Sequence, residues 1–264
     1  MKTIAILMAT LLVLSVMPMV MAQNDTVVDE APIDEEVIDA GVTPDSPFYG
    51  LERAMERLKL AFMRNKAERA LYKIQMAEER LAETEQMIEE DNLEAAQEAE
   101  EAHDEILEEA QQEAEEIESD DGEEVAEEAL EDVEAVQLGL LSHSEKVALV
   151  HNRILERLQA GNASQEQLDH LTEVFARIET KAQEMEQKVA EKRERVRTRY
   201  KVLSELNETE LAEKEQAFLV KKQATEQRRE EAKNRVREQE QEIEDEIEDE
   251  SEEGTSNQAQ TGQQ

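Results

Sequence analysis

Apolar side chains recur every three or four residues along most of the chain, which is the spacing of one face of an α-helix. The first apolar stripe begins at Phe48 and ends at Phe62, and a second follows it from Leu71 to Ile88. Two such stripes joined by a short link predict either two antiparallel neighbouring helices that bury their apolar faces or one helix continued through a kink. We therefore expect a bundle core made of Phe48, Leu51, Met55, Leu58, Phe62, Leu71, Ile74 and Leu81.

Capping residues divide the first part of this pattern into successive helices. Ser46 is placed to cap the first helix, and Pro47 suits its first position because proline lacks the N–H that would be unpaired there. Asn65, with Glu68 three residues later, predicts the start of a second helix. Asp91 or Asn92 restarts the pattern for a third.

The later helices are longer and more charged. Asp121 starts a helix that we expect to end near Gly139, and Ser142 with Glu145 predicts a new helix that runs to Gly161. The longest apolar repeat follows Ser164 with heptad spacing, and a weaker one extends from residue 208 to about residue 248.

The composition agrees with an all-α protein. The chain has 264 residues with only 7 Gly and 4 Pro, no Cys, and few aromatic side chains. Narrow seams of Ala, Leu, Ile and Val between long helices bury less area per residue than a spherical core does. The predicted fold is an elongated helical bundle domain over residues 44–161, followed by long charged, coiled-coil-like helices over residues 162–249.

Residues 1–22 have the pattern of a secretory signal peptide. Lys2 precedes an apolar run from Ile4 to Val20, and small residues stand at the −3 and −1 positions of a cleavage site before Gln23. We expect an extracytoplasmic protein, secreted or at the cell envelope. An uncleaved membrane anchor is the alternative, because the run approaches the length that spans a bilayer. Residues 23–43 read as a disordered acidic spacer and residues 250–264 as a disordered tail.

The charge is unevenly distributed. The 68 acidic and 29 basic residues give a net charge of −39, which argues against a nucleic-acid partner. No Lys or Arg occurs between residues 81 and 145, whereas residues 192–201 form the densest basic segment. We therefore expect this basic segment to pair with the region 81–145.

Four short motifs resemble a known family. They are Pro44-Asp45-Ser46-Pro47-Phe48-Tyr49, Glu56-Arg57-Leu58, Lys66-Ala67-Glu68-Arg69-Ala70 and Ala77-Glu78-Glu79-Arg80-Leu81-Ala82-Glu83. In this order they resemble a domain of unknown function found in exported or membrane-tethered bacterial and archaeal proteins. The resemblance covers about residues 42–158. It implies a helical fold and an extracytoplasmic location, and it implies no catalytic residues.

The chain offers little conventional site chemistry. The histidines His103, His143, His151 and His170 have no transition-metal spacing, and Cys ligands are absent. Asp120-Asp121-Gly122 does not fit a calcium-binding EF-hand, because Gly122 at loop position six would place Ile117 at position one. We therefore expect no catalytic, cofactor or metal site. Weak binding of divalent cations along the acidic helices stays open.

Three Asn-x-Ser/Thr sequences are candidate glycosylation sites. Their acceptors are Asn24, Asn162 and Asn207. The sequence thus favours an exported, non-enzymatic helical protein with a structural or protein-interaction role, through self-association or a partner helix. The alternatives are an envelope stress or chaperone-like protein and a low-affinity divalent-cation binder.

Overall fold

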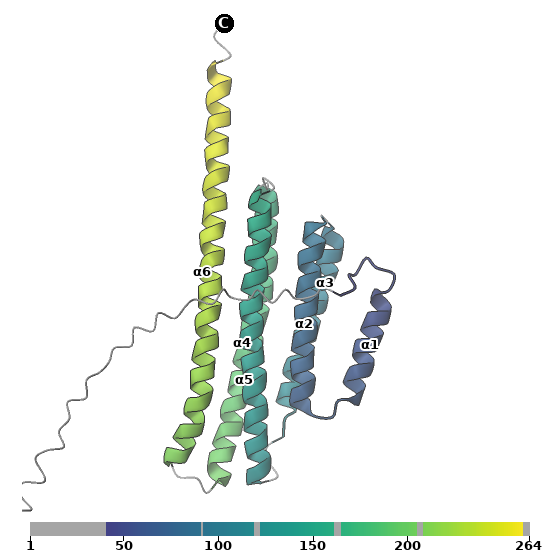
Figure 1. Ribbon diagram of the computed structural model, residues 1–264, viewed down its shortest axis with the longest axis vertical. Coiled ribbons are helices and arrows are strands. Elements are labelled where there is room, and N and C mark those ends of the chain that lie inside the picture. The colour runs from purple at the N-terminus through teal and green to yellow at the C-terminus, as the bar shows by residue number, and fades with distance from the viewer. Residues whose placement is uncertain (1–40, 91, 119–121, 161–164, 205–207, 261–264) are drawn as a thin grey trace, which may run out of the picture. The chain divides into compact units, whose positions relative to one another are not determined.

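Six α-helices make up the described part of the chain, and no described residue lies in a strand (Figure 1). The computed structural model describes residues 41–90, 92–118, 122–160, 165–204 and 208–260. The helices are α1 (Tyr49–Phe62), α2 (Lys66–Glu89), α3 (Leu93–Glu115), α4 (Glu123–Ala160), α5 (Gln165–Leu203) and α6 (Glu208–Gln260). The all-α helical bundle predicted from the sequence is confirmed.

The caps of α2 and α3 lie where the sequence predicts them. The Asn65 side chain accepts a hydrogen bond from the backbone N–H of Glu68 at 2.9 Å, and that of Asn92 accepts from Ala95 at 3.3 Å. The start of α1 differs. Ser46 Oγ accepts instead from the N–H of Phe48 at 3.3 Å, so Pro47 lies in a turn and the helix begins at Tyr49.

The predicted break between Gly139 and Ser142 is wrong, because α4 continues through both residues. Gly139 lies where α4 approaches α2 closely. A Cβ atom at this position would stand 2.9 Å from Leu71 Cδ2 and 3.4 Å from Ile74 Cδ1. The glycine therefore permits close packing of the two helices.

The described helices belong to one compact unit, Ile38–Gln264, with two buried clusters. Helix α2 packs on α3, α4 packs on α5, α6 and α2, and α3 also packs on α5. The first cluster joins the first half of α2, the end of α3, the first half of α4 and the end of α5. The second joins the end of α4, the start of α5 and the part of α6 from Ala232 to Ile243, together with Leu81. Both clusters contain residues from each side of the expected boundary at 161–162.

The predicted core is wrong for the first apolar stripe. Ile74 and Leu81 are buried and Leu71 is half-buried, but the five side chains of the α1 stripe are exposed. The reason lies in the other side of α1, which carries Glu56 and Leu60 and is the side that faces the bundle.

Candidate functional site

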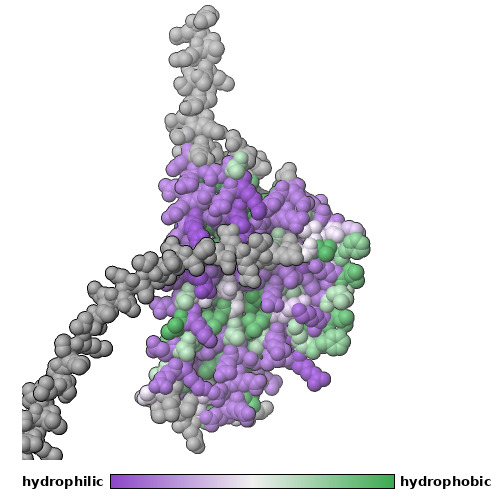
Figure 2. All heavy atoms as spheres, in the orientation of Figure 1, coloured by the Kyte–Doolittle hydropathy of each residue, from purple (hydrophilic) through white to green (hydrophobic). Residues whose placement is uncertain are grey.

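Helix α1 presents its apolar side to solvent. The exposed fractions are 65% for Phe48, 63% for Leu51, 59% for Met55, 51% for Leu58 and 78% for Phe62. We call these five residues the α1 apolar face. Figure 2 shows the hydrophobic surface that gathers at the α1 edge of the bundle. Exposed apolar patches of this kind commonly mark interaction sites in soluble proteins.

A buried ionic cluster attaches the opposite side of α1 to α2. The Arg80 side chain is fully buried, and its Nη2 donates to Glu56 Oε1 at 2.6 Å. Its Nη1 lies 2.8 Å from Glu83 Oε1, on the next turn of α2. Glu56 and Glu83 are themselves buried, so the three charged groups share one dry site between the two helices.

One carboxyl group in this cluster has a strongly raised pKa. Burial raises the pKa of Glu83 to about 8; Arg80 opposes this shift, while Glu52 and Glu56 add to it. The cluster joins α1 to the bundle through the contact between Arg80 and Glu56.

Aromatic and backbone contacts complete the attachment. The Arg80 guanidinium lies 5.3 Å from the ring centre of Tyr49, and Lys59 Nζ lies 3.8 Å above the Tyr72 ring. Arg69 Nη1 donates to the carbonyl of Leu60 at 3.2 Å. These contacts fix the rotation of α1 so that its polar side faces the bundle.

Two histidines meet in the bundle interior. His103 on α3 and His143 on α4 are fully buried, and their Nε2 atoms are 3.0 Å apart. His103 Nδ1 lies 2.9 Å from Asp104 Oδ1. Burial, with His103 and Lys146 nearby, holds the pKa of His143 well below its ordinary value. Sequence spacing could not reveal this pair, because the two residues stand on different helices.

A third histidine stacks on an aromatic ring. The His151 ring on α4 lies 4.4 Å from that of Phe175 on α5, at an interplanar angle of 13°. Burial lowers the pKa of His151 to about 4, although Glu240 Oε1 is 3.6 Å from its Nε2. Its ring is therefore neutral and serves as a flat packing group.

The predicted pairing of the basic segment with the acidic region is confirmed. Lys192 donates to the carbonyls of Glu115 and Ile117 at 2.7 Å each, Arg193 binds Glu134 at 2.8 Å, and Arg195 binds Glu115 at 2.6 Å. Cations elsewhere make further pairs with this region, namely Glu100–Arg177, Glu108–Lys181, Glu127–Lys214 and Glu145–Arg228.

One acid of this region contacts three cations of α2. Lys66, Arg69 and Lys73 all bond to Glu113, at 3.1, 2.6 and 3.0 Å. Burial alone would raise the pKa of Glu113, but these hydrogen bonds lower it to about 2. Glu113 therefore stays ionised across the physiological range and joins α3 to α2.

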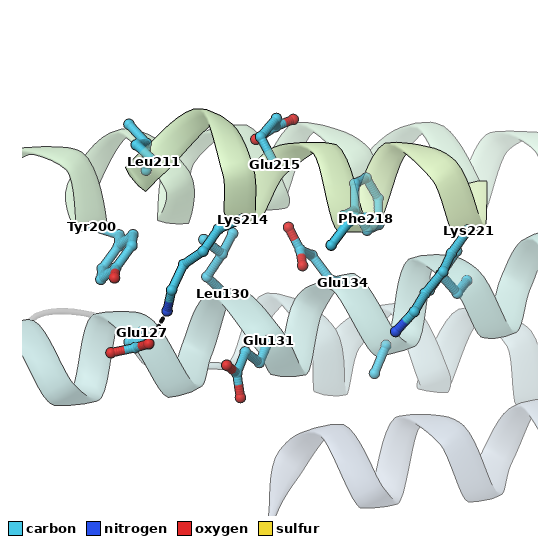
Figure 3. Close-up of a pocket in the computed structure, with 13 residues that line it drawn as sticks. Glu127, Leu130, Glu131, Glu134, Tyr200, Leu211, Lys214, Glu215, Phe218 and Lys221 are labelled. Atoms are coloured by element: carbon cyan, nitrogen blue, oxygen red, sulfur yellow. Dashed lines mark hydrogen bonds and ion pairs between the residues drawn. The ribbon is translucent and has the colours of Figure 1, made fainter. Parts of the chain in front are cut away.

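A cleft of about 410 Å³ opens between α4, the end of α5 and the start of α6. Its floor is apolar, with Leu130, Tyr200 and Phe218, and in Figure 3 Lys214 crosses it toward Glu127. Arg193 lies 3.9 Å from the Phe218 ring centre and bonds to Glu134 and Glu215. The acids on the cleft walls are thus largely paired with cations of the chain itself.

The remaining predicted sites have different outcomes. Asn24, Asn162 and Asn207 lie outside the described residues, and so does the predicted signal segment. Among the residues that the structure describes, no group of three or more His, Asp or Glu side chains is arranged to hold a metal ion. Within the same ranges, no helix combines the length and apolar character needed to cross a bilayer.

Comparison with known proteins finds similarity over the first part of the chain. Residues 41–140 match the model of a domain of unknown function, DUF5667. This match begins just before α1 and ends within α4, short of the residue 158 expected from the sequence motifs. No curated protein and no solved structure matches the chain. Residues 41–140 are thus similar to a domain of unknown function, and the match extends through α1, α2 and α3.

Proposed function

We propose that this chain is an exported, non-enzymatic helical protein that acts by binding at the cell envelope, and that the α1 apolar face is its binding surface. The observation that carries the proposal is the orientation of α1. Helix α1 and its cap residue Phe48 carry five large apolar side chains, yet the helix buries an ionic cluster and leaves those side chains in water.

The energetics support a binding role for this face. Covering apolar surface stabilises a complex by roughly 25 cal/mol for each Å² removed from water. A fixed helix loses little further conformational entropy when a partner covers it. Export is supported by the signal-like residues 1–22, whose apolar run follows a single lysine.

Photo-crosslinking in cells that make the protein tests this proposal. A photoreactive amino acid replaces Leu58 on the α1 apolar face in one variant, and Val220 on α6 in the control. The two positions are similarly exposed, at 51% and 58%. We expect the chain in the envelope or extracellular fraction, with an adduct formed from position 58 and little from position 220.

Two results would contradict the proposal. One is a chain that is found only in the cytoplasm. The other is an extracytoplasmic chain that forms no more adduct from position 58 than from position 220, since the α1 apolar face would then have no partner at the envelope.

A further inference from the structure

Within residues 47–64, the exposed charged side chains are all basic. They are Arg57, Lys59 and Arg64. The two acidic side chains of this stretch are not exposed. Glu52 is half-buried and accepts from the backbone N–H of Val42 at 3.1 Å, and Glu56 is buried against Arg80. Residues 47–64 of a chain of net charge −39 therefore expose only basic charged side chains, and the nearest exposed acids along the sequence are Asp45 before this stretch and Glu68 after it.

The apolar surface is broad and uninterrupted. At 100° per residue, the α1 apolar face occupies roughly 80° of the helix circumference. The small exposed residues Gly50, Ala54 and Ala61 extend it on one side, and a Cβ atom added at Gly50 would meet nothing within 4 Å. No polar side chain interrupts the face. It thus combines large apolar groups with a basic rim, which is the composition of helices that lie in a membrane interface.

We propose that α1 binds an anionic lipid surface, with the α1 apolar face inserted among the acyl chains and Arg57 and Arg64 beside the headgroups. This inference rests on the proposed function and names its partner. It does not require that residues 1–22 stay attached as an anchor.

The charge distribution favours lipid over a second copy of the chain. Two copies packed through the α1 apolar face would bring two basic rims together, and like charges at an interface oppose association. The negative charge elsewhere on the protein is screened over a Debye length of about 8 Å. The basic side chains nearest the membrane therefore dominate the electrostatic interaction with it.

The chemistry of the face also favours lipid over a folded protein partner. Protein interfaces usually carry about one hydrogen bond per 100–200 Å². The five side chains of the α1 apolar face offer no hydrogen-bonding group, and a lipid phase requires none.

Vesicle flotation with a chain that begins at Gln23 tests the proposal. Residues Ile38–Gln264 form a compact unit of their own, so this chain keeps every described residue and lacks the apolar run 4–20. The probes are vesicles of phosphatidylcholine alone and of phosphatidylcholine mixed with phosphatidylglycerol. We expect binding to the mixed vesicles, with weaker binding to the neutral ones and at high salt.

Two double variants separate the apolar and basic contributions. Leu51→Asp/Leu58→Asp should weaken binding to mixed vesicles at least about tenfold, because each change removes a large apolar contact. Arg57→Gln/Arg64→Gln should reduce binding to mixed vesicles and leave neutral vesicles little affected. The matched control is Leu219→Asp/Val220→Asp on α6, where the native residues are also exposed. This control should bind like the parent chain.

The proposal is overturned if the parent chain does not float with mixed vesicles, if the Leu51→Asp/Leu58→Asp chain binds as well as its parent, or if neutral vesicles bind equally well. A dimer that this double variant dissociates would identify a second copy as the occupant. A protein adduct from position 58 without vesicle binding would overturn the lipid assignment and leave the proposed function standing. Circular dichroism confirms that each variant stays helical.

Discussion

At the scale of single residues, Arg80 forms the buried ionic contact between α1 and α2. Its guanidinium is completely buried and contacts both Glu56 and Glu83. A buried ion pair adds little net stability compared with apolar packing, but removing one partner leaves an uncompensated charge in a dry site.

Arg80→Ala should therefore lower the free energy of unfolding by about 3–5 kcal/mol. Arg57→Ala, which removes an exposed arginine of α1, should change it by less than about 0.5 kcal/mol. Urea denaturation followed by circular dichroism measures both values. Equal effects of the two substitutions would show that the cluster does not hold α1 in place.

His151 predicts a pH dependence of stability. Its pKa is about 4 in the folded protein, below the ordinary value of 6.5, so the unfolded chain takes up the proton first as the pH falls. The contribution of neutral His151 to the free energy of unfolding is complete above pH 6.5 and declines progressively as the pH falls toward 4. The loss amounts to about 3 kcal/mol.

The variant His151→Phe keeps an aromatic ring on Phe175 and removes the titrating group. Between pH 6.5 and 4, the wild type should lose about 3 kcal/mol of stability relative to this variant. Glu83 acts in the opposite sense, because its raised pKa of about 8 gives a contribution that is full below pH 4.5 and lost as the pH rises through 8. The Glu83 contribution is the same in the wild type and in His151→Phe, so it cancels in the comparison. Parallel stability profiles of the two proteins between pH 6.5 and 4 would contradict the assigned role of His151.

At the scale of elements, the local sequence predicts α2 and α3 correctly, because the capping residue and the apolar stripe indicate the same helix in each case. Asn65 and Asn92 cap the helices that the periodicity predicts. The pattern of α1 is equally clear, yet it predicts the wrong buried side. Periodicity shows which side of a helix is apolar, but not what covers it, and the partner of Glu56 lies 24 residues away at Arg80.

Gly139 in α4 is a second position where local sequence misleads. Glycine often ends a helix, but here it lies at a close contact between α4 and α2. Gly139→Leu should destabilise the protein by about 1–3 kcal/mol through overpacking against Leu71 and Ile74. Gly139→Ala should be nearly neutral, because its Cβ meets the movable end of Leu71 while alanine favours the helix. Thermal melting of both variants measures this difference. A Gly139→Leu protein as stable as Gly139→Ala would show that the contact is loose.

At the scale of the whole molecule, cations of α5 and α6 form ion pairs with several acids of the region 81–145. The separation of acidic and basic segments predicted this pairing in general, since opposite charges on long helices gain by lying together. The individual pairs depend on the rotation of each helix, which the apolar stripes define only roughly. The buried pair His103–His143 gave no signal at all, because its members lie 40 residues apart.

This internal pairing predicts how the protein responds to calcium. Glu100, Glu113, Glu115 and Glu134 already bond to Arg or Lys side chains. Calorimetric titration with calcium to millimolar concentration should therefore give only small, non-saturating heats. A saturable isotherm of defined stoichiometry would instead support the divalent-cation binder that the acidic sequence left open.

The central claim is that α1 faces outward with its apolar side, and thiol labelling tests it directly. The chain has no cysteine, so Leu58→Cys and Leu60→Cys each introduce a single reactive group. Leu58 is 51% exposed and Leu60 is 8% exposed. We predict that Leu58→Cys reacts at nearly the rate of the unfolded chain, and that Leu60→Cys reacts at least about tenfold more slowly because labelling there requires local opening. Protection of Leu58→Cys with free reaction of Leu60→Cys would contradict the account, since α1 would then bury its apolar side.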